Sequence, residues 1–99
     1  MIEERNRTVL KLKVNNHPGV MSHVCGLFAR RAYNMEAILC LPMQDGVHSR
    51  IWLLLDENER LEQVIRQTLK LEDVVDIQQQ QGVDHRVFEN LEVLFSENV

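Results

Sequence analysis

Two hydrophobic periodicities follow one another along this chain in an order that few small folds can accommodate. Residues 8–14 (TVLKLKV) alternate between apolar and polar, which is typical of a half-buried strand. After a loop rich in Asn, Pro and Gly, apolar residues recur at helical spacing, so an amphipathic helix is expected over residues 19–32. The domain therefore begins with a strand, a loop and a helix.

The next segment predicts two further strands joined by a tight turn. Residues 35–41 (MEAILCL) are an apolar run, ended by Pro42, that indicates a mostly buried strand. Residues 49–55 (SRIWLLL) would return antiparallel to it, because Asp45-Gly46 between them is a strong hairpin signal.

A second helix and a last strand complete the pattern. Asp56 and Glu59 have the spacing of a capping box, and a helix is expected from there to about Leu71. Residues 74–77 then predict a strand that fades into a glutamine-rich run. The order β-α-β-β-α-β is that of a ferredoxin-like α+β domain, with one antiparallel sheet and both helices on one face, over residues 8–80.

Residues 82–99 form a tail of different character. They carry −3 of the net charge of −4, so the remainder of the chain is close to neutral at −1. Leu91, Val93 and Phe95 alternate, which favours a further strand, and a short helix over residues 86–91 is the alternative. Such a tail would suit docking on a partner chain, and a loosely attached terminus is the other interpretation.

Length and charge narrow the classes of function. A chain of 99 residues buries roughly 65% of its surface, enough for one two-layer core but not for a deep cleft with a cofactor domain. The acidic balance argues against nucleic-acid or anionic-membrane surfaces. Two cysteines are too few for a disulfide framework, the N-terminal MIEERNR lacks an apolar signal segment, and no apolar run approaches a membrane span. We expect a soluble, cytoplasmic protein.

No recognisable catalytic or metal motif is present. Cys25 has no histidine at a helical partner position and lies among apolar residues, so a buried, inert thiol is expected. The spacing of His23, Cys25, Cys40 and His48 matches no usual zinc site. RNA binding is disfavoured because aromatic residues are sparse on the strands and basic residues are not clustered. We predict no catalytic residue and no metal ligand.

The loop over residues 15–21 (NNHPGVM) is the most informative segment. It lies before a helix N-terminus, where free backbone N–H groups and the helix dipole favour a carboxylate or a phosphate. Gly19 would let a ligand approach the backbone closely, and the Asn16 amide can both donate and accept. From the residues alone, a plain turn is the alternative.

This loop also carries a resemblance to a known family. NHPGVM followed by SHVCGLFARRAYNME, then CLP, IWLL, RLEQ and KLEDVV, resembles the ACT domain of the small regulatory subunits of acetolactate synthase (acetohydroxyacid synthase), most of all the short isozyme I type, over residues 8–78. Longer members of that family have a second C-terminal domain, and residues 86–95 are similar to the beginning of its first strand. The resemblance therefore implies regulation through the ACT domain and a short tail.

The resemblance implies a homodimer that holds a branched-chain amino acid, chiefly valine, between two ACT domains. The loop of one protomer would bind the carboxylate and amine, and the segment after the first helix of the other would close the site. The valine-binding residues would be Asn16, His17, Pro18, Gly19, Val20, Met21, Asn34, Met35 and Ile38. The role of His17 stays open, and Met35 and Cys40 are expected to serve mainly in strand packing.

The implied function is that of a non-catalytic subunit in branched-chain amino acid biosynthesis. It would activate a large subunit that carries thiamine diphosphate, Mg²⁺ and FAD, make that subunit sensitive to valine, and itself bind no cofactor. Two alternatives remain: a free-standing amino-acid-sensing ACT module that controls another enzyme or a transcription factor, and a small stand-alone enzyme of ferredoxin-like fold.

Overall fold

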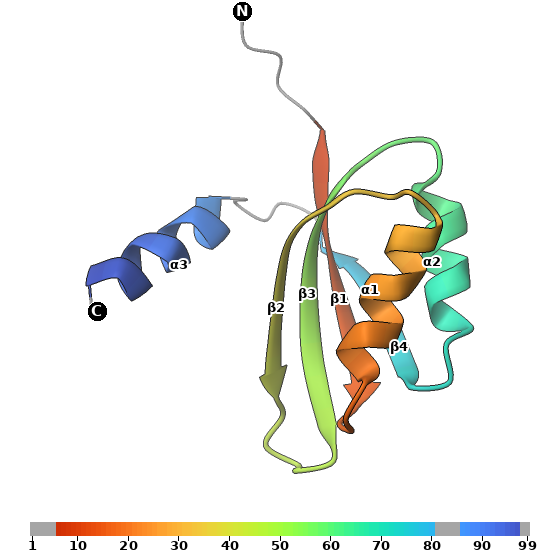
Figure 1. Cartoon of the computed structure of the whole chain (residues 1–99), viewed down its shortest axis with the longest axis horizontal. Coiled ribbons are helices and arrows are strands. Elements are labelled where there is room, and N and C mark those ends of the chain that lie inside the picture. The colour runs from red at the N-terminus through yellow and green to blue at the C-terminus, as the bar shows by residue number, and fades with distance from the viewer. Residues whose placement is uncertain (1–5, 81–85, 98–99) are drawn as a thin grey trace, which may run out of the picture.

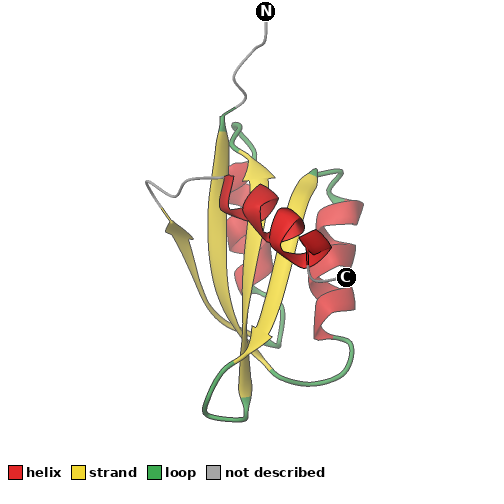
Figure 2. Cartoon of the chain, turned by 90° about the vertical axis from the view of Figure 1, so that its left-hand side faces the viewer, coloured by secondary structure: helices red, strands yellow, loops and turns green. Residues whose placement is uncertain are grey.

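Four strands form one antiparallel sheet in the order β2-β3-β1-β4 in the computed structural model, which describes residues 6–80 and 86–97. The strands are β1 (Arg7–Asn15), β2 (Met35–Pro42), β3 (His48–Asp56) and β4 (Val74–Gln80). Helices α1 (Val20–Arg30) and α2 (Leu61–Leu69) cover one face of the sheet (Figure 1). Helix α3 (Arg86–Glu97) crosses the opposite face (Figure 2). The predicted ferredoxin-like α+β fold is confirmed.

The core lies between the sheet and the helix pair α1–α2. Leu10 and Leu12 of β1 are fully buried, and they pair in register with Leu53 and Ile51 of β3. The alternation over residues 8–14 therefore assigns one face of β1 to the core, as predicted. The helices complete this core with Val20, Val24, Leu27, Phe28, Leu61 and Val64.

Strand β2 is less buried than the sequence suggested. Its first six residues are only half-buried and its last two are exposed, so the prediction of a mostly buried strand was wrong. The reason is its position at the edge of the sheet: it pairs with β3 on one side, and no strand of the described chain pairs with its other side. Ile38 and Cys40 face the core, while Leu39 and Leu41 face the side that α3 crosses.

The entrance to α2 uses a different residue from the predicted capping box. Asp56 is the last residue of β3, and α2 begins only at Leu61 with no side-chain cap on its first turn. Instead, the Asn58 side-chain oxygen accepts a hydrogen bond from the backbone N–H of Arg60 at 2.8 Å. The capping box fails because the strand extends through Asp56 and a turn separates it from the helix.

The tail forms a helix rather than the favoured strand. Helix α3 runs over twelve residues, longer than the short helix considered as the alternative. Phe88 and Leu91, three residues apart, are half-buried against the sheet, whereas Val93 and Phe95 are exposed. The apolar residues of this segment fit helical spacing as well as alternation, and contact with the sheet decides between the two. The start and end of the predicted tail, residues 82–85 and 98–99, lie outside the described residues.

No helix in the described part of the chain is long and apolar enough to cross a membrane. Most of the N-terminal segment on which the prediction about a signal sequence rested, residues 1–5, lies outside the described residues.

Candidate functional site

The loop between β1 and α1 presents an open helix terminus to solvent. No side chain forms a capping hydrogen bond at the start of α1, and its first turn contains no acidic residue. Backbone N–H groups of a first helical turn have no partner within the helix, and together with the helix dipole they attract anions. This end of α1 is therefore chemically suited to a carboxylate.

Gly19 sets the shape of this terminus. Its φ of +92° lies in the left-handed region, and a Cβ built on it would meet nothing within 4 Å. Glycine is thus required here by backbone conformation and not by crowding. The space beside Gly19 is open.

Two backbone hydrogen bonds hold the loop to neighbouring segments. The Asn15 N–H donates to the carbonyl of Asp73 at 2.8 Å, and the Asn16 N–H donates to the carbonyl of Val47 at 2.9 Å. The loop is thereby tied both to the turn after α2 and to the β2–β3 hairpin. These two bonds fix the position of the loop backbone.

His17 belongs to a polar cluster that no pattern in the sequence predicts. Its Nε2 lies 2.5 Å from Oδ2 of Asp73, and its Nδ1 lies 2.5 Å from the carbonyl oxygen of Pro18. His23 Nδ1 is 3.7 Å from the same Asp73 oxygen. With acceptors at both ring nitrogens, the imidazolium is the form that satisfies every contact. Asp73 lies far from His17 in the sequence, so no local sequence pattern predicts the His17–Asp73 contact.

These contacts shift both titrations. The bond to the Pro18 carbonyl, followed by the bond to Asp73, raises the pKa of His17 above its ordinary value. The bond from His17 in turn lowers the pKa of the Asp73 carboxyl. The contacts with Pro18 and Asp73 therefore favour the protonated form of His17 beside the start of α1.

The predicted valine-binding residues fall into two groups that one protomer does not bring together. The first group lies in the loop and the first turn of α1: Asn16, His17, Pro18 and Gly19 are exposed, Met21 is half-buried, and Val20 is buried in the core. The second group lies after α1, with Asn34 exposed and Met35 and Ile38 half-buried. Figure 1 shows the loop at one end of the sheet and the start of β2 at the other.

The cysteines are placed differently from one another. Cys25 is exposed on α1, so the prediction that it is buried was wrong; it lies beside, not within, the stripe that faces the sheet. Cys40 is half-buried, and burial raises the pKa of its thiol. Among the residues that the structure describes, no group of three or more His, Cys, Asp or Glu side chains is arranged to hold a metal ion.

Comparisons with known proteins agree on one family. Residues 10–76 match the family described as "AHAS small subunit-like ACT domain". The acetolactate synthase isozyme 1 small subunit of Escherichia coli (strain K12) is 57% identical over 90 residues, which cover 91% of this chain and 93% of that protein. The isozyme 3 small subunit of the same strain is 37% identical over 70 residues, which cover 70% of this chain and 43% of that protein.

Solved structures show the same fold. The crystal structure of the acetolactate synthase small subunit from Thermotoga maritima has a TM-score of 0.69 at 23% identity, covering 89% of this chain and 67% of that one. The ACT domain of the GTP pyrophosphokinase from Chlorobium tepidum has a TM-score of 0.61 at 13% identity, covering 78% of this chain and all of that one.

Proposed function

Because this chain belongs to the family of acetohydroxyacid synthase small-subunit-like ACT domains, we propose that it regulates an acetolactate synthase. It would activate a large catalytic subunit in the cytoplasm and confer feedback inhibition by valine, without catalysing the reaction itself. The observation that carries this proposal is the 57% identity to an isozyme 1 small subunit along 93% of that subunit's length. Thiamine diphosphate, Mg²⁺ and FAD would belong to the large subunit.

The loop would supply the first half of the valine site. Its uncapped helix terminus offers N–H donors to the valine carboxylate, and Gly19 leaves open space through which the ligand reaches them. The exposed Asn16 amide oxygen would accept from the ammonium group. His17, which holds the Pro18 carbonyl, would fix the loop backbone while keeping a positive charge near the carboxylate.

A second copy of the chain would supply the other half. The outer edge of β2 has no partner strand in the described chain, and its half-buried residues leave apolar area to cover. If two β2 strands paired antiparallel about a two-fold axis, the start of one strand would lie beside the end of the other. Asn34, Met35 and Ile38 of one protomer would then lie near the loop of its partner, although they are far from their own loop.

Regulation requires a difference in affinity between two states of the complex. Valine bound between two protomers would inhibit only if it bound the inhibited arrangement of the holoenzyme more tightly than the active one. Valine bound across the dimer interface meets this requirement. Each protomer would supply half of the site, so a shift of one protomer against the other would change the distance between the two halves and with it the affinity for valine.

Reconstitution tests the proposal. Purified large subunit would be assayed alone, with this chain, and with this chain plus valine, while calorimetry measures valine binding to the isolated chain. We expect higher activity on adding the chain and loss of that activity with valine. An unchanged rate on adding the chain would refute the subunit role, whereas activation without valine sensitivity would refute only the ligand site.

A further inference from the structure

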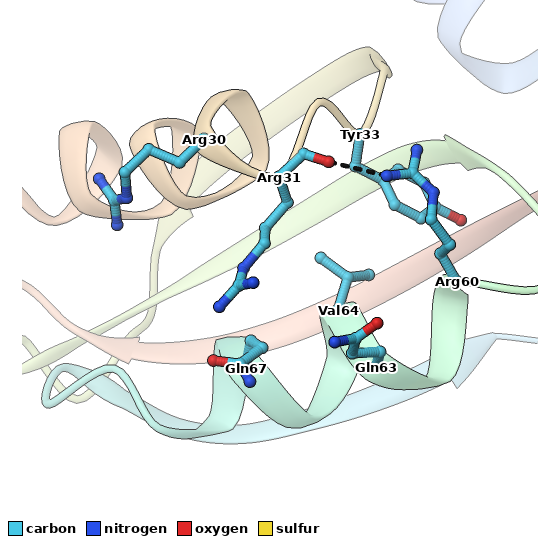
Figure 3. Close-up of a pocket in the computed structure, with 7 residues that line it drawn as sticks. All are labelled: Arg30, Arg31, Tyr33, Arg60, Gln63, Val64 and Gln67. Carbon is cyan, nitrogen blue, oxygen red and sulfur yellow. Dashed lines mark hydrogen bonds between the residues drawn. The ribbon is translucent and has the colours of Figure 1, made fainter.

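A groove lined by cationic side chains runs between the C-terminal part of α1 and helix α2 (Figure 3). We call it the α1–α2 groove. One part has a volume of about 280 Å³ and is lined by Arg30, Arg31, Arg60, Gln63 and Gln67 among others. It continues along the helices into a second hollow of about 440 Å³, to which Lys70 is added. Apolar residues of both helices, such as Leu27 and Val64, form its floor.

The charge of this groove is opposite to that of the chain. Arg30, Arg31, Arg60 and Lys70 line its two parts, and no Asp or Glu is among the lining residues, although the whole chain carries −4. Within residues 6–80 and 86–96, the side chains of Arg30 and Arg31 form no ion pair with a carboxylate. The prediction that basic residues are not clustered was therefore wrong, because the fold gathers residues separated by about a third of the chain.

One arginine of the α1–α2 groove is held by contacts within the chain, and the other two can bind an anion. Arg60 donates to the carbonyl oxygens of Arg31 at 2.8 Å and Ala32 at 3.1 Å, and its guanidinium lies 5.3 Å from the ring centroid of Tyr33. Figure 3 shows the Arg31 side chain extending from the end of α1 toward Gln67 of α2. Arg30 and Arg31 are exposed and free of competing carboxylates among the described residues, so they can meet an anion from outside.

We propose that the α1–α2 groove binds an acidic segment of the catalytic large subunit, an inference that rests on the function proposed above. Guanidinium groups bind carboxylates through paired hydrogen bonds, and the Gln63 and Gln67 amides would serve the backbone of a bound segment. The apolar floor would contact the aliphatic parts of its side chains. Charge complementarity would also make assembly faster and dependent on salt.

The shape and lining of the groove favour a protein segment over other anions. Sites for small ligands are enclosed and mostly apolar, whereas this groove runs open along two helices and has a cationic rim. Recognition of single-stranded RNA uses exposed aromatic rings for stacking, and the aromatic residue here, Tyr33, is 4% exposed and covered by Arg60.

The test compares the double variant Arg30→Gln/Arg31→Gln with the control Arg66→Gln. Arg66 also lies on α2, but it pairs with Glu62 at 2.8 Å and does not line the groove. Affinity for the purified large subunit would be measured at low and high salt, and circular dichroism would establish that each variant folds. At low salt we expect the double variant to bind about tenfold more weakly, with the difference shrinking at high salt and the control matching the wild type.

The outcomes separate this inference from the proposed function. A double variant that binds the large subunit as tightly as the wild type at both salt concentrations would overturn the groove assignment and leave the subunit role standing. Failure of the wild type itself to bind would overturn both. Titration with inorganic pyrophosphate is the second arm: binding that requires Arg30 and Arg31 would assign the groove to a small anion instead.

Discussion

The two ends of α1 use a left-handed residue for opposite purposes. Gly19 precedes the helix with φ +92°, and Ala32 follows it with φ +51°. At the N-terminal end no side chain caps the first turn, and the Val20 N–H donates only a long hydrogen bond, 3.4 Å, to the carbonyl of His17. At the C-terminal end backbone donors bind the carbonyls of Leu27, Phe28 and Ala29, and Arg60 binds the two carbonyls that follow the helix. Side-chain and backbone contacts thus gather at the C-terminal end of α1, whereas its first turn has no side-chain cap.

The closed end is built as a Schellman motif with an added side chain. The Ala32 N–H donates to the carbonyl of Ala29 at 3.0 Å, and the Tyr33 N–H donates to that of Phe28 at 2.9 Å. Tyr33 is anchored in turn, because its hydroxyl donates to the Asp56 carbonyl. A rigid C-terminal end fixes the direction of α1, and through it the position of the open end.

Placing a carboxylate at the open end gives the largest expected effect. In Gly19→Asp, the new side chain would enter the space left for the ligand and repel its carboxylate, costing about 1.5–3 kcal/mol of binding, or tenfold and more in affinity. We expect activation of the large subunit to persist while inhibition by valine is lost. The measurement is the activity of the reconstituted enzyme over a range of valine concentrations.

Gly19→Asn is the matched control, since it introduces a side chain of the same size and the same backbone strain without the charge. It should retain more valine sensitivity than the aspartate variant. If both variants lose valine inhibition equally, the backbone conformation at residue 19, and not the added charge, controls valine binding. If Gly19→Asp keeps full valine inhibition, the loop is not part of the valine site.

Removing the Arg60 contacts at the closed, C-terminal end of α1 should have the next largest effect. Arg60→Ala removes two hydrogen bonds to the carbonyls of Arg31 and Ala32, just after α1, and the contact with the Tyr33 ring, which should lower the free energy of unfolding by about 1–2 kcal/mol. Urea denaturation measures this directly. Arg60→Lys serves as the control because it keeps the positive charge but loses the planar guanidinium with its two donor groups. The stability of Arg60→Lys should lie between that of the wild type and that of Arg60→Ala. A variant as stable as the wild type would show that the backbone motif alone closes this end.

The open end could be anticipated from the sequence more fully than the closed one. Asn, Pro and Gly between a strand pattern and a helix pattern predict a loop at a helix N-terminus, and each of these signals is local. The closed end has no such signal: Ala32 stands where glycine is usual, and Arg60 reaches it from across the fold. Contacts between distant segments depend on how α1 and α2 pack, which periodicity does not encode.

The same distinction explains the errors at β2 and α3. An apolar run predicts burial, but β2 is half-exposed because its place at the sheet edge is a property of topology. Apolar residues in the tail fit both periods, and only contact with the sheet selects the helix. Of the candidate site, the sequence therefore predicts the loop, while the His17–Asp73 pair and the basic groove needed the fold.

Relieving backbone strain at Ala32, at the closed end of α1, should increase stability by a smaller amount. Ala32→Gly removes the steric cost of a Cβ at positive φ and should raise the free energy of unfolding by about 0.5–1 kcal/mol, after the greater unfolded-state entropy of glycine is subtracted. Gly46→Ala is the opposite change at a hairpin residue with φ +78° and should destabilise by a similar amount. If both variants shift stability in the same direction, strain at positive φ is not the controlling factor.

Protonation at the open end should give the smallest effect, because His17 and Asp73 lie near the surface. The pKa of His17 is raised from 6.5, so its contribution to stability is complete below that value and disappears as the pH rises through the folded-state pKa. The pKa of Asp73 is lowered from 3.8, so its contribution is present above that value and is lost as the pH falls through the folded-state pKa. The stability difference between wild type and His17→Gln should therefore be greatest between pH 3.8 and pH 6.5 and decline as the pH rises through the folded-state pKa of His17. NMR titration of the His17 ring in wild type and in Asp73→Asn tests which contacts raise the pKa of His17. If the Pro18 carbonyl is the main partner, the pKa should fall in the variant but stay above 6.5. An unchanged pKa of His17 in Asp73→Asn would show that Asp73 does not contribute to the shift.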